Sequence, residues 1–428
     1  MTADTKTNNM TTDALARQTQ APNLVDVAIV GGAMAGATLA LGLRALSEKL
    51  KRPLKIALIE AHKPGSEHPG FDARSIAIAH GSIFELKRLG LWSKLAHLGT
   101  PIENIHISDR GHFGMTELNA EDFHLQNLGQ VVELERVGQV LFKQLEASDI
   151  QLHCPGRLTH VEAQADCQLL TLNDGTQIKT ALLVAADGVN SRVRQAFNLP
   201  LEQMDFAQVA LVANVETDKP HDNWAFERFT NTGPLAVLPM APLKGNSRVS
   251  LVWALNPSEA KRLQSAAKDD FLSELQKAFG FRAGRFTHVG ERFSYPLLLS
   301  HMPRPIYHRT VFIGNAAQTL HPIAGQGFNL GLRDLVSLLD VIKQTLLTEG
   351  SSKEVADLGS ANVTHNYLKS REKDRNTTMT NIEFLVRGFS NDYWPLVAGR
   401  SLGLRLLSWV PPLKAPVART AMGWKSLS

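Results

Sequence analysis

The sequence predicts an α/β fold in which a parallel-sheet domain carries an inserted antiparallel-sheet domain and is followed by a helical C-terminal region. A strand, a glycine-rich turn, a helix and a second strand follow one another near the N-terminus. Segments of alternating apolar and polar residues lie between Gln208 and Asn256. Apolar residues at helical spacing occupy 328–347, and helix-like sequence resumes at Tyr367 and runs to Pro411-Pro412.

The composition is that of an ordinary globular protein of two or three domains. The chain has 428 residues, of which 43% are hydrophobic and 20% charged, so collagen-like, disordered and disulfide-scaffold classes are excluded. Two cysteines, Cys154 and Cys167, are too few for a disulfide framework and favour a reducing, cytoplasmic compartment. The net charge of +4 is too small for a nucleic-acid binder, and no run reaches the ~18 apolar residues of a membrane span.

The first structural unit after a polar tail is a strand, turn, helix and strand of the Rossmann type. The run 24–30 predicts a strand, and 55–59 predicts a second strand that ends at Glu60. The turn from Gly31 to Gly36 fits G-x-G-x-x-G with Ala33 at the second glycine, a pattern that places a pyrophosphate at a helix N-terminus. A purely structural turn is the alternative, but Glu60 stands where an acid binds the ribose hydroxyls, which favours a dinucleotide site.

A second turn follows the short apolar strand 181–185. It contains Asp187-Gly188, and the strand before it can return to the first sheet. Taken alone, this turn is better explained as an Asx turn that caps a helix.

A third turn follows the strand 310–313, which can also return to the first sheet. It runs from Gly314-Asn315 to Gly325-Gln326-Gly327, where a long helix begins. Glycines let backbone amides approach a planar ligand, and the positive helix end lies at the same place. The segment therefore predicts a site for a ring that carries negative charge.

The three turns, in this order, resemble the flavin-dependent aromatic hydroxylases of the para-hydroxybenzoate hydroxylase type, from about Leu24 to the C-terminus. The resemblance implies a Rossmann-like FAD-binding domain with an inserted substrate domain, and NAD(P)H as co-substrate. It assigns FAD binding to the three turns and two arginines, of which the second is the looser match: Gly31, Gly32, Gly36, Glu60, Arg74, Arg136, Asp187, Gly188, Asn315, Gly325, Gln326, Gly327 and Asn329.

The third turn departs from the family's usual Gly-Asp-Ala-Ala-His. Here it is Gly314-Asn-Ala-Ala-Gln318, and with 225–239 it is similar to the ubiquinone-biosynthesis branch, most closely the 2-polyprenyl-6-methoxyphenol hydroxylases. That similarity implies a monooxygenase that hydroxylates a polyprenylated phenol with NAD(P)H and O2 through a flavin C4a-hydroperoxide. A flavin oxidoreductase that does not activate O2, and a non-catalytic flavoprotein subunit of a biosynthetic complex, are the competing interpretations.

The histidines supply little chemistry of their own. His321 precedes Pro322 in the third turn and is a weak candidate for acid–base work. His106 and His112 have no carboxylate at a ligand spacing, so we expect no metal site.

The expected domain limits follow from these assignments. We predict a disordered tail over 1–23, an FAD-binding domain, a substrate domain and a helical C-terminal region; the FAD-binding domain comprises 24–110, 128–200 and 301–345, the substrate domain 111–127 and 201–300, and the C-terminal region 346–428.

The last part of the C-terminal region is basic and apolar. After Asp392 it holds no acidic residue, whereas cations alternate with leucines and tryptophan. Such a segment can lie at the inner face of an anionic membrane or contact a partner in a biosynthetic complex, and a helix whose leucines face the core is the alternative.

Overall fold

The computed structural model describes residues 21–65, 68–72, 74–321, 325–348, 356–389, 394–409, 414, 418–419 and 422–423. The expected tail, apart from its last three residues, lies outside these ranges, and the first strand already begins at Asn23. No helix in these ranges is long and apolar enough to span a membrane.

The first sheet is the predicted parallel sheet. Its principal strands follow the order β17-β18-β11-β1-β2-β8 and have the bounds Ile306–Tyr307, Thr310–Phe312, Gln177–Ala185, Asn23–Val30, Ile56–Ile59 and Gln151–His153. β1 pairs in parallel with β2 and β11, and β11 pairs in parallel with β18, so both later strands return to this sheet as expected. Two further strands extend it by antiparallel pairing: β10 (Gln168–Leu172) pairs with β11, and β9 (Leu158–Ala163) pairs with β10.

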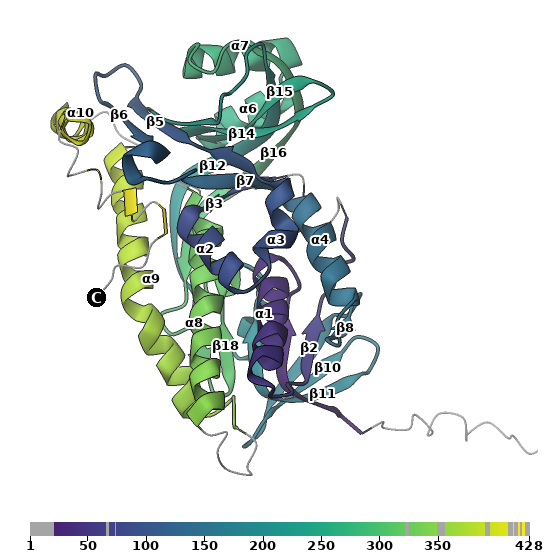
Figure 1. Ribbon diagram of the computed structural model, residues 1–428. Coiled ribbons are helices and arrows are strands. Elements are labelled where there is room, and N and C mark those ends of the chain that lie inside the picture. The colour runs from purple at the N-terminus through teal and green to yellow at the C-terminus, as the bar shows by residue number, and fades with distance from the viewer. Residues whose placement is uncertain are drawn as a thin grey trace, which may run out of the picture.

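Helices cover the first sheet because each carries an apolar face. The core on this side contains buried residues of β1, α1 and α8, such as Ile29, Leu39 and Leu335. α1 (Met34–Leu50) and α8 (Gln326–Thr348) lie side by side along the sheet, and α4 (Leu134–Glu146) packs next to α1 (Figure 1). Shorter helices are α2 (His80–Arg88), α3 (Trp92–Leu95) and α5 (Arg192–Ala196).

The second sheet is mainly antiparallel and has the strand order β19-β16-β12-β15-β14-β13-β5-β6. The bounds in that order are Gln318–Thr319, Phe286–His301, Glu202–Thr217, Asn246–Leu255, Gly233–Leu243, Trp224–Thr230, Asn104–Asp109 and Met115–Asn119. Helices α6 (Pro257–Ser265) and α7 (Lys268–Phe279) pack on one face, shown at the top of Figure 1, through residues such as Leu211 and Phe271. The other face is turned toward the first domain.

β5 and β6 join this second sheet, because β5 pairs in parallel with β13. The chain therefore enters the sheet at Asn104, whereas the expected substrate domain began at residue 111. A small sheet of β3 (Ser75–Ala79), β7 (Gly129–Glu133) and β4 (Thr100–Ile102) connects the two parts.

The C-terminal region is helical, as predicted. α9 (Ala361–Phe389) lies along α8, and α10 (Trp394–Trp409) stands beside β6 (Figure 1). The turn between β5 and β6 holds α10 in place: Arg405 Nε donates a hydrogen bond to the Phe113 carbonyl at 2.7 Å.

Candidate active site

A cavity of about 2830 Å³ lies between the two sheets. Its walls include the residues at the carboxyl ends of β1 and β2, the turns after β11 and β18, and the inner face of the second sheet. A pocket for one drug-sized ligand measures roughly 300–1,000 Å³, so this cavity has room for two ligands at once. In parallel sheets the carboxyl ends of the strands are where cofactors bind.

The glycines of the first turn allow a tight approach of helix to strand. Gly31 has a φ of 99°, and a side chain there would meet the Ala186 carbonyl oxygen at 2.4 Å. A methyl at Gly36 would lie 1.8 Å from the Gly31 carbonyl oxygen. The first turn of α1 has no acidic residue, so its free amides and positive end remain available to an anion.

Glu60 lies at the end of β2 and borders the cavity, where it was expected. Its Oε2 accepts a hydrogen bond from Gly32 N at 2.5 Å, its Oε1 accepts one from His62 N at 2.9 Å, and His68 Nε2 lies 3.4 Å from Oε1. Burial alone would raise the pKa of this carboxyl, but the hydrogen bonds from His68, His62 and Gly32 outweigh burial and lower it. Glu60 is therefore held as a carboxylate, the form that accepts ribose hydroxyls.

Of the two predicted arginines, the structure places only Arg74 at the cavity. Its Nε donates to Asp72 Oδ1 at 2.8 Å, and its guanidinium lies 4.7 Å from the ring centroid of Tyr295. Tyr295 belongs to the second sheet and donates to Asp72 Oδ2 at 3.3 Å, so Arg74 joins the two domains. Arg136, by contrast, is half exposed on α4, 3.7 Å from Glu133, and is not among the residues that line the cavity.

The second turn has features of both roles considered for it, a helix cap and a cofactor contact. Asp187 Oδ2 accepts hydrogen bonds from the backbone N–H groups of Arg192 and Val193 at 2.7 and 3.2 Å, so it caps α5. Its Oδ1 is buried without a hydrogen-bond partner among the described residues, although Asp187 and Gly188 both line the cavity. Burial raises the pKa of this carboxyl. An unpartnered acceptor at a cavity wall fits a ligand that carries hydroxyl donors.

The third turn begins beside the first, since a side chain on Gly314 would lie 3.4 Å from Ala35 Cβ. Asn315 is exposed to the cavity, and Gly325, Gln326 and Gly327 border it where α8 begins. A side chain at Gly327 would meet nothing within 4 Å, so open space begins at its Cα.

Asn329, a predicted cofactor residue, is buried and holds this turn. Its Nδ2 donates to the carbonyls of Gly325 and Ala77 at 2.7 and 3.1 Å, and its Oδ1 accepts from Ala79 N at 2.9 Å. These bonds fix the turn against β3.

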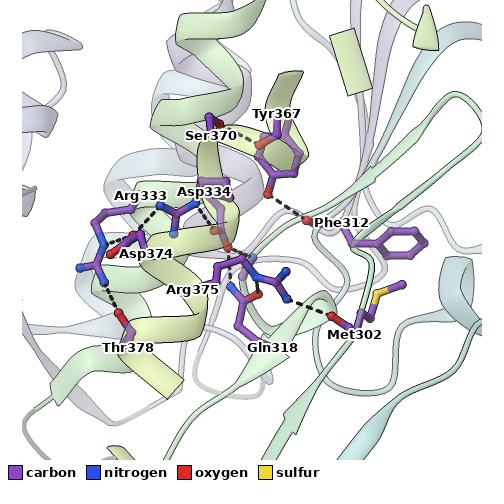
Figure 2. A network of polar contacts seen from close by, with 12 residues as sticks. Met302, Phe312, Gln318, Arg333, Asp334, Tyr367, Ser370, Asp374, Arg375 and Thr378 are labelled. Carbon is purple, nitrogen blue, oxygen red and sulfur yellow. Dashed lines mark hydrogen bonds and ion pairs between the residues drawn. The ribbon is translucent and has the colours of Figure 1, made fainter. Parts of the chain in front are cut away.

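Behind the third turn lies a buried network of charged side chains, which Figure 2 shows. Asp334 of α8 accepts hydrogen bonds from Gly314 N at 3.1 Å, Gln318 Nε2 at 2.5 Å and Arg371 Nε at 2.8 Å. Arg375 of α9 donates to Gln318 Oε1 at 2.8 Å. The helix α9 therefore supports both ends of the Gly314–Gln318 segment, and no sequence motif indicated these partners.

His321 is fully buried behind the same turn and is not among the cavity-lining residues. Burial lowers the pKa of His321 to about 4, and its Nε2 lies 3.3 Å from Gln208 Oε1. A neutral histidine in this position contributes to packing. Among the described residues, no group of three His, Cys, Asp or Glu side chains could hold a metal ion.

The inner face of the second sheet forms the apolar wall of the cavity. The side chains on this wall come from six strands: Ile105, Ile107, Ala210, Val212, Ala225, Phe229, Ala236, Leu238, Val252 and Leu297. One carboxylate, Glu227, stands among them. The sequence analysis assigned Glu227 no role, although a charged residue between Ala225 and Phe229 on the same strand face is a signal that could have found it.

Comparisons with known proteins agree with this geometry. A profile of the FAD binding domain family matches residues 24–356. Ubiquinone hydroxylase UbiL of Rhodospirillum rubrum is 33% identical over 410 residues, covering 94% of this chain and 90% of that protein. The 3-demethoxyubiquinol 3-hydroxylase of Escherichia coli is 30% identical, covering 93% of this chain and 98% of its own length.

Solved structures share the fold at low sequence identity. The p-nitrophenol 4-monooxygenase PnpA of Pseudomonas putida has a TM-score of 0.73 at 15% identity, covering 95% of this chain and 100% of that one. A variant of HpxO from Klebsiella pneumoniae, complexed with FAD, has a TM-score of 0.71 at 14% identity, covering 94% and 99%. These likenesses show the architecture of the two sheets and the helices around them.

Proposed function

The chain belongs to the FAD binding domain family, among the FAD-dependent monooxygenases that include the ubiquinone hydroxylases, and on that premise we propose that it hydroxylates the ring of a polyprenylated phenol in ubiquinone biosynthesis. FAD supplies the chemistry when bound, because reduction by NAD(P)H lets the flavin activate O2. The chain's own residues bind, orient and exclude water.

The residues present fit FAD. The amides at the start of α1 suit the pyrophosphate, Glu60 suits the adenosine ribose, and the unpartnered Asp187 Oδ1 suits a ribityl hydroxyl. The open space at Gly327 and the start of α8 suit the flavin ring, whose reduced form carries negative charge.

The single observation that carries the proposal is the continuity of this cradle with the apolar wall. One cavity contains both the turns of the first sheet and the inner face of the second. An aromatic ring with a hydrocarbon tail can therefore lie against the wall while it faces the third turn. A cavity of this kind binds such a ring mainly by removing apolar surface from water.

Turnover of a short-chain substrate separates the three interpretations that the sequence leaves open. The FAD-loaded protein is mixed with NAD(P)H, ¹⁸O2 and a phenol that carries one prenyl unit, and products are analysed by mass spectrometry. We expect one ¹⁸O atom in the ring for each NAD(P)H consumed. NAD(P)H oxidation without labelled product would instead indicate a flavin oxidoreductase, and no oxidation would indicate a non-catalytic flavoprotein.

We further propose that α10 contacts the membrane surface that holds the polyprenyl tail. One face of α10 borders the cavity through Leu404 and its neighbours, whereas Leu402, Leu406 and Trp409 are exposed. Residues at this spacing form one stripe along a helix. We also considered a helix whose leucines face the core. Of the leucines named here, Leu404 is buried, whereas Leu402 and Leu406 are exposed.

The position of α10 supports a membrane rather than a protein partner. In the turn next to α10, the Phe113 carbonyl accepts a hydrogen bond from Arg405, and the Phe113 side chain is exposed. A helix with one apolar face outward and another at the cavity is suited to pass a hydrocarbon chain from a bilayer into the site. The remaining expected cations are Arg400, Lys414, Arg419 and Lys425; the side chains of Arg400 and Lys425 lie outside the described residues.

A further inference from the structure

We propose that Glu227 is the catalytic base of the site, which accepts the proton of the substrate's ring hydroxyl. This inference rests on the proposed function, and it assigns the reacting hydroxyl to one residue of the chain.

Glu227 is the middle of three residues that alternate along the inner face of β13. Ala225 and Phe229 precede and follow it on that face, and all three line the cavity. The residues between them, Phe226 and Arg228, belong to the opposite face, where Phe226 packs on the core under α6 and α7. The Glu227 side chain therefore points toward the cavity.

The two flanking residues locate Glu227 relative to the third turn. Ala225 packs in one cluster with Ala77 of β3, and Ala77 Cβ lies 3.4 Å from the position that a side chain on Gly325 would take. Phe229 packs in another cluster with Leu320 and Leu330, which belong to the far end of that turn and to α8. Glu227 thus stands between two contacts with the segment that we assign to the flavin ring.

No described residue forms a hydrogen bond or ion pair with the Glu227 carboxylate. Its neighbours across the sheet are Ile107 on β5 and Ala236 on β14, and both are apolar. The residue is half-buried and borders the cavity. Burial raises the pKa of Glu227 to about 7.

A carboxylate among apolar side chains with no polar partner is costly, so a protein retains one where a ligand completes it. A phenol supplies the missing donor, and its ring fits between the apolar neighbours of Glu227. In the proton transfer the phenolic O–H bond breaks, its electron pair stays on the ring oxygen, and the proton forms an O–H bond with a Glu227 carboxylate oxygen. The ring becomes more electron-rich, as an electrophilic hydroxylation requires, and the proton returns to the ring oxygen when the product forms.

The test compares a phenol with its methyl ether. Dissociation constants of a phenol with one prenyl unit and of its O-methyl ether are measured from the change in flavin absorbance, for the FAD-loaded parent, Glu227→Gln and Glu117→Gln. Glu117→Gln is the matched control because it replaces a carboxylate by an amide on β6. Glu117 follows the cavity-lining Thr116 and is itself not among the lining residues. We expect the parent and E117Q to bind the phenol about tenfold or more tightly than the ether, as a hydrogen bond to a charged group allows, and E227Q to bind both equally.

Turnover supplies the second measurement. E227Q is expected to form hydroxylated product about 100-fold more slowly, within the usual contribution of a general base, while NAD(P)H reduces its flavin at the parent rate. A parent that prefers the phenol but hydroxylates nothing would refute the proposed function and leave only the hydrogen bond between Glu227 and the phenol supported. A hydroxylating parent whose preference and rate survive in E227Q would overturn the assignment alone.

If E227Q does not load FAD, Glu227→Asp is measured in its place. It keeps the carboxylate with a shorter reach, so we expect it to retain a weakened preference for the phenol. Failure of both variants to fold would show that the carboxylate is structural, and that result would also overturn the proposal.

Discussion

At the scale of single residues, a substitution at Gly327 tests whether the third turn contacts the cofactor or is only a structural turn. Because a side chain there meets nothing within 4 Å, Gly327→Val should fold normally and occupy space that the flavin ring needs. We expect a large loss of FAD affinity and of turnover, with an unchanged melting temperature for the FAD-free protein. Fluorescence titration with FAD and thermal unfolding of the same preparation measure the two effects.

Gly36 provides the contrasting control. A methyl in that position would collide with the Gly31 carbonyl oxygen, so Gly36→Ala should lower the melting temperature even without FAD. If Gly327→Val binds FAD as tightly as the parent, the third turn does not contact the flavin ring. If it loses as much stability as Gly36→Ala, Gly327 has only a structural role.

Glu227 also predicts a pH-dependent stability. Its folded pKa of about 7 lies above the ordinary value of 4.5, so ionisation of the buried carboxyl destabilises the folded state above pH 7 and has no effect below pH 4.5. The penalty is on the order of 3 kcal/mol. The neighbouring residues on its face do not titrate, since they are Ala225, Phe229, Ile107 and Ala236.

Glu227→Gln should therefore melt at a higher temperature than the parent at pH 8, and the difference should shrink as the pH falls from 7 and disappear below pH 4.5. Thermal unfolding across this pH range measures it in the absence of substrate. A variant that is less stable than the parent at pH 8 would show that the carboxylate has a stabilising partner.

Sequence reasoning located residues whose role follows from local chain geometry. Gly31 and Glu60 are recognisable because a tight turn and a strand end are defined by a few consecutive residues. Glu227 and Tyr295 were missed because their role depends on which sheet face is inward and on what lies opposite. That information is created by the docking of two domains and is absent from any short motif.

At the scale of elements, α9 and α8 stabilise the third turn through the network in Figure 2. Arg371 and Asp334 are both almost completely buried, with Arg371 Nε 2.8 Å from Asp334 Oδ1. Arg371→Met would leave a buried carboxylate uncompensated. We expect the free energy of unfolding to fall by about 3–5 kcal/mol and FAD to bind more weakly, because Asp334 also holds Gly314. Urea unfolding and FAD titration measure these effects.

Arg262→Met is the matched control. Arg262 forms an ion pair with Glu259 at 2.8 Å on the exposed surface of α6, where such pairs contribute little. We expect its unfolding curve and FAD affinity to coincide with those of the parent. Equal behaviour of the Arg371 and Arg262 variants would contradict a supporting role for α9.

The sequence predicted the order of helices and strands but not how the network connects them. Apolar spacing indicated both α8 and the helix after Tyr367. The charged residues along α9 would ordinarily be assigned to a solvated face, yet Arg371 and Arg375 are buried. Likewise β5 joins the second sheet through pairing with β13, a contact between residues more than a hundred positions apart.

At the scale of the whole molecule, the cavity lies between two walls of different chemistry. The turns of the first sheet, which we assign to the phosphate-bearing cofactor, form one side of the cavity, whereas the wall of the second sheet suits hydrocarbon. α10 borders the cavity and also bears the exposed residues Leu402, Leu406 and Trp409. With α10 on a bilayer, as we propose, a substrate tail would remain in the membrane while its ring reaches the flavin.

If α10 contacts a membrane surface, as we propose, the protein should co-sediment with vesicles. We expect the parent to bind vesicles that contain anionic lipid more strongly than neutral ones, and high salt to weaken this binding, because each cation near the surface adds roughly 1 kcal/mol. Replacing Leu402, Leu406 and Trp409 together by serine should abolish binding and leave FAD content unchanged. Phe281→Ser is the control, since Phe281 is equally apolar and 68% exposed but follows α7 in the other domain. Equal binding to neutral and anionic vesicles, or to neither, would reject the basic segment as an electrostatic anchor. Retention of other biosynthetic proteins by the stripe alone would instead identify the stripe as a protein-binding surface.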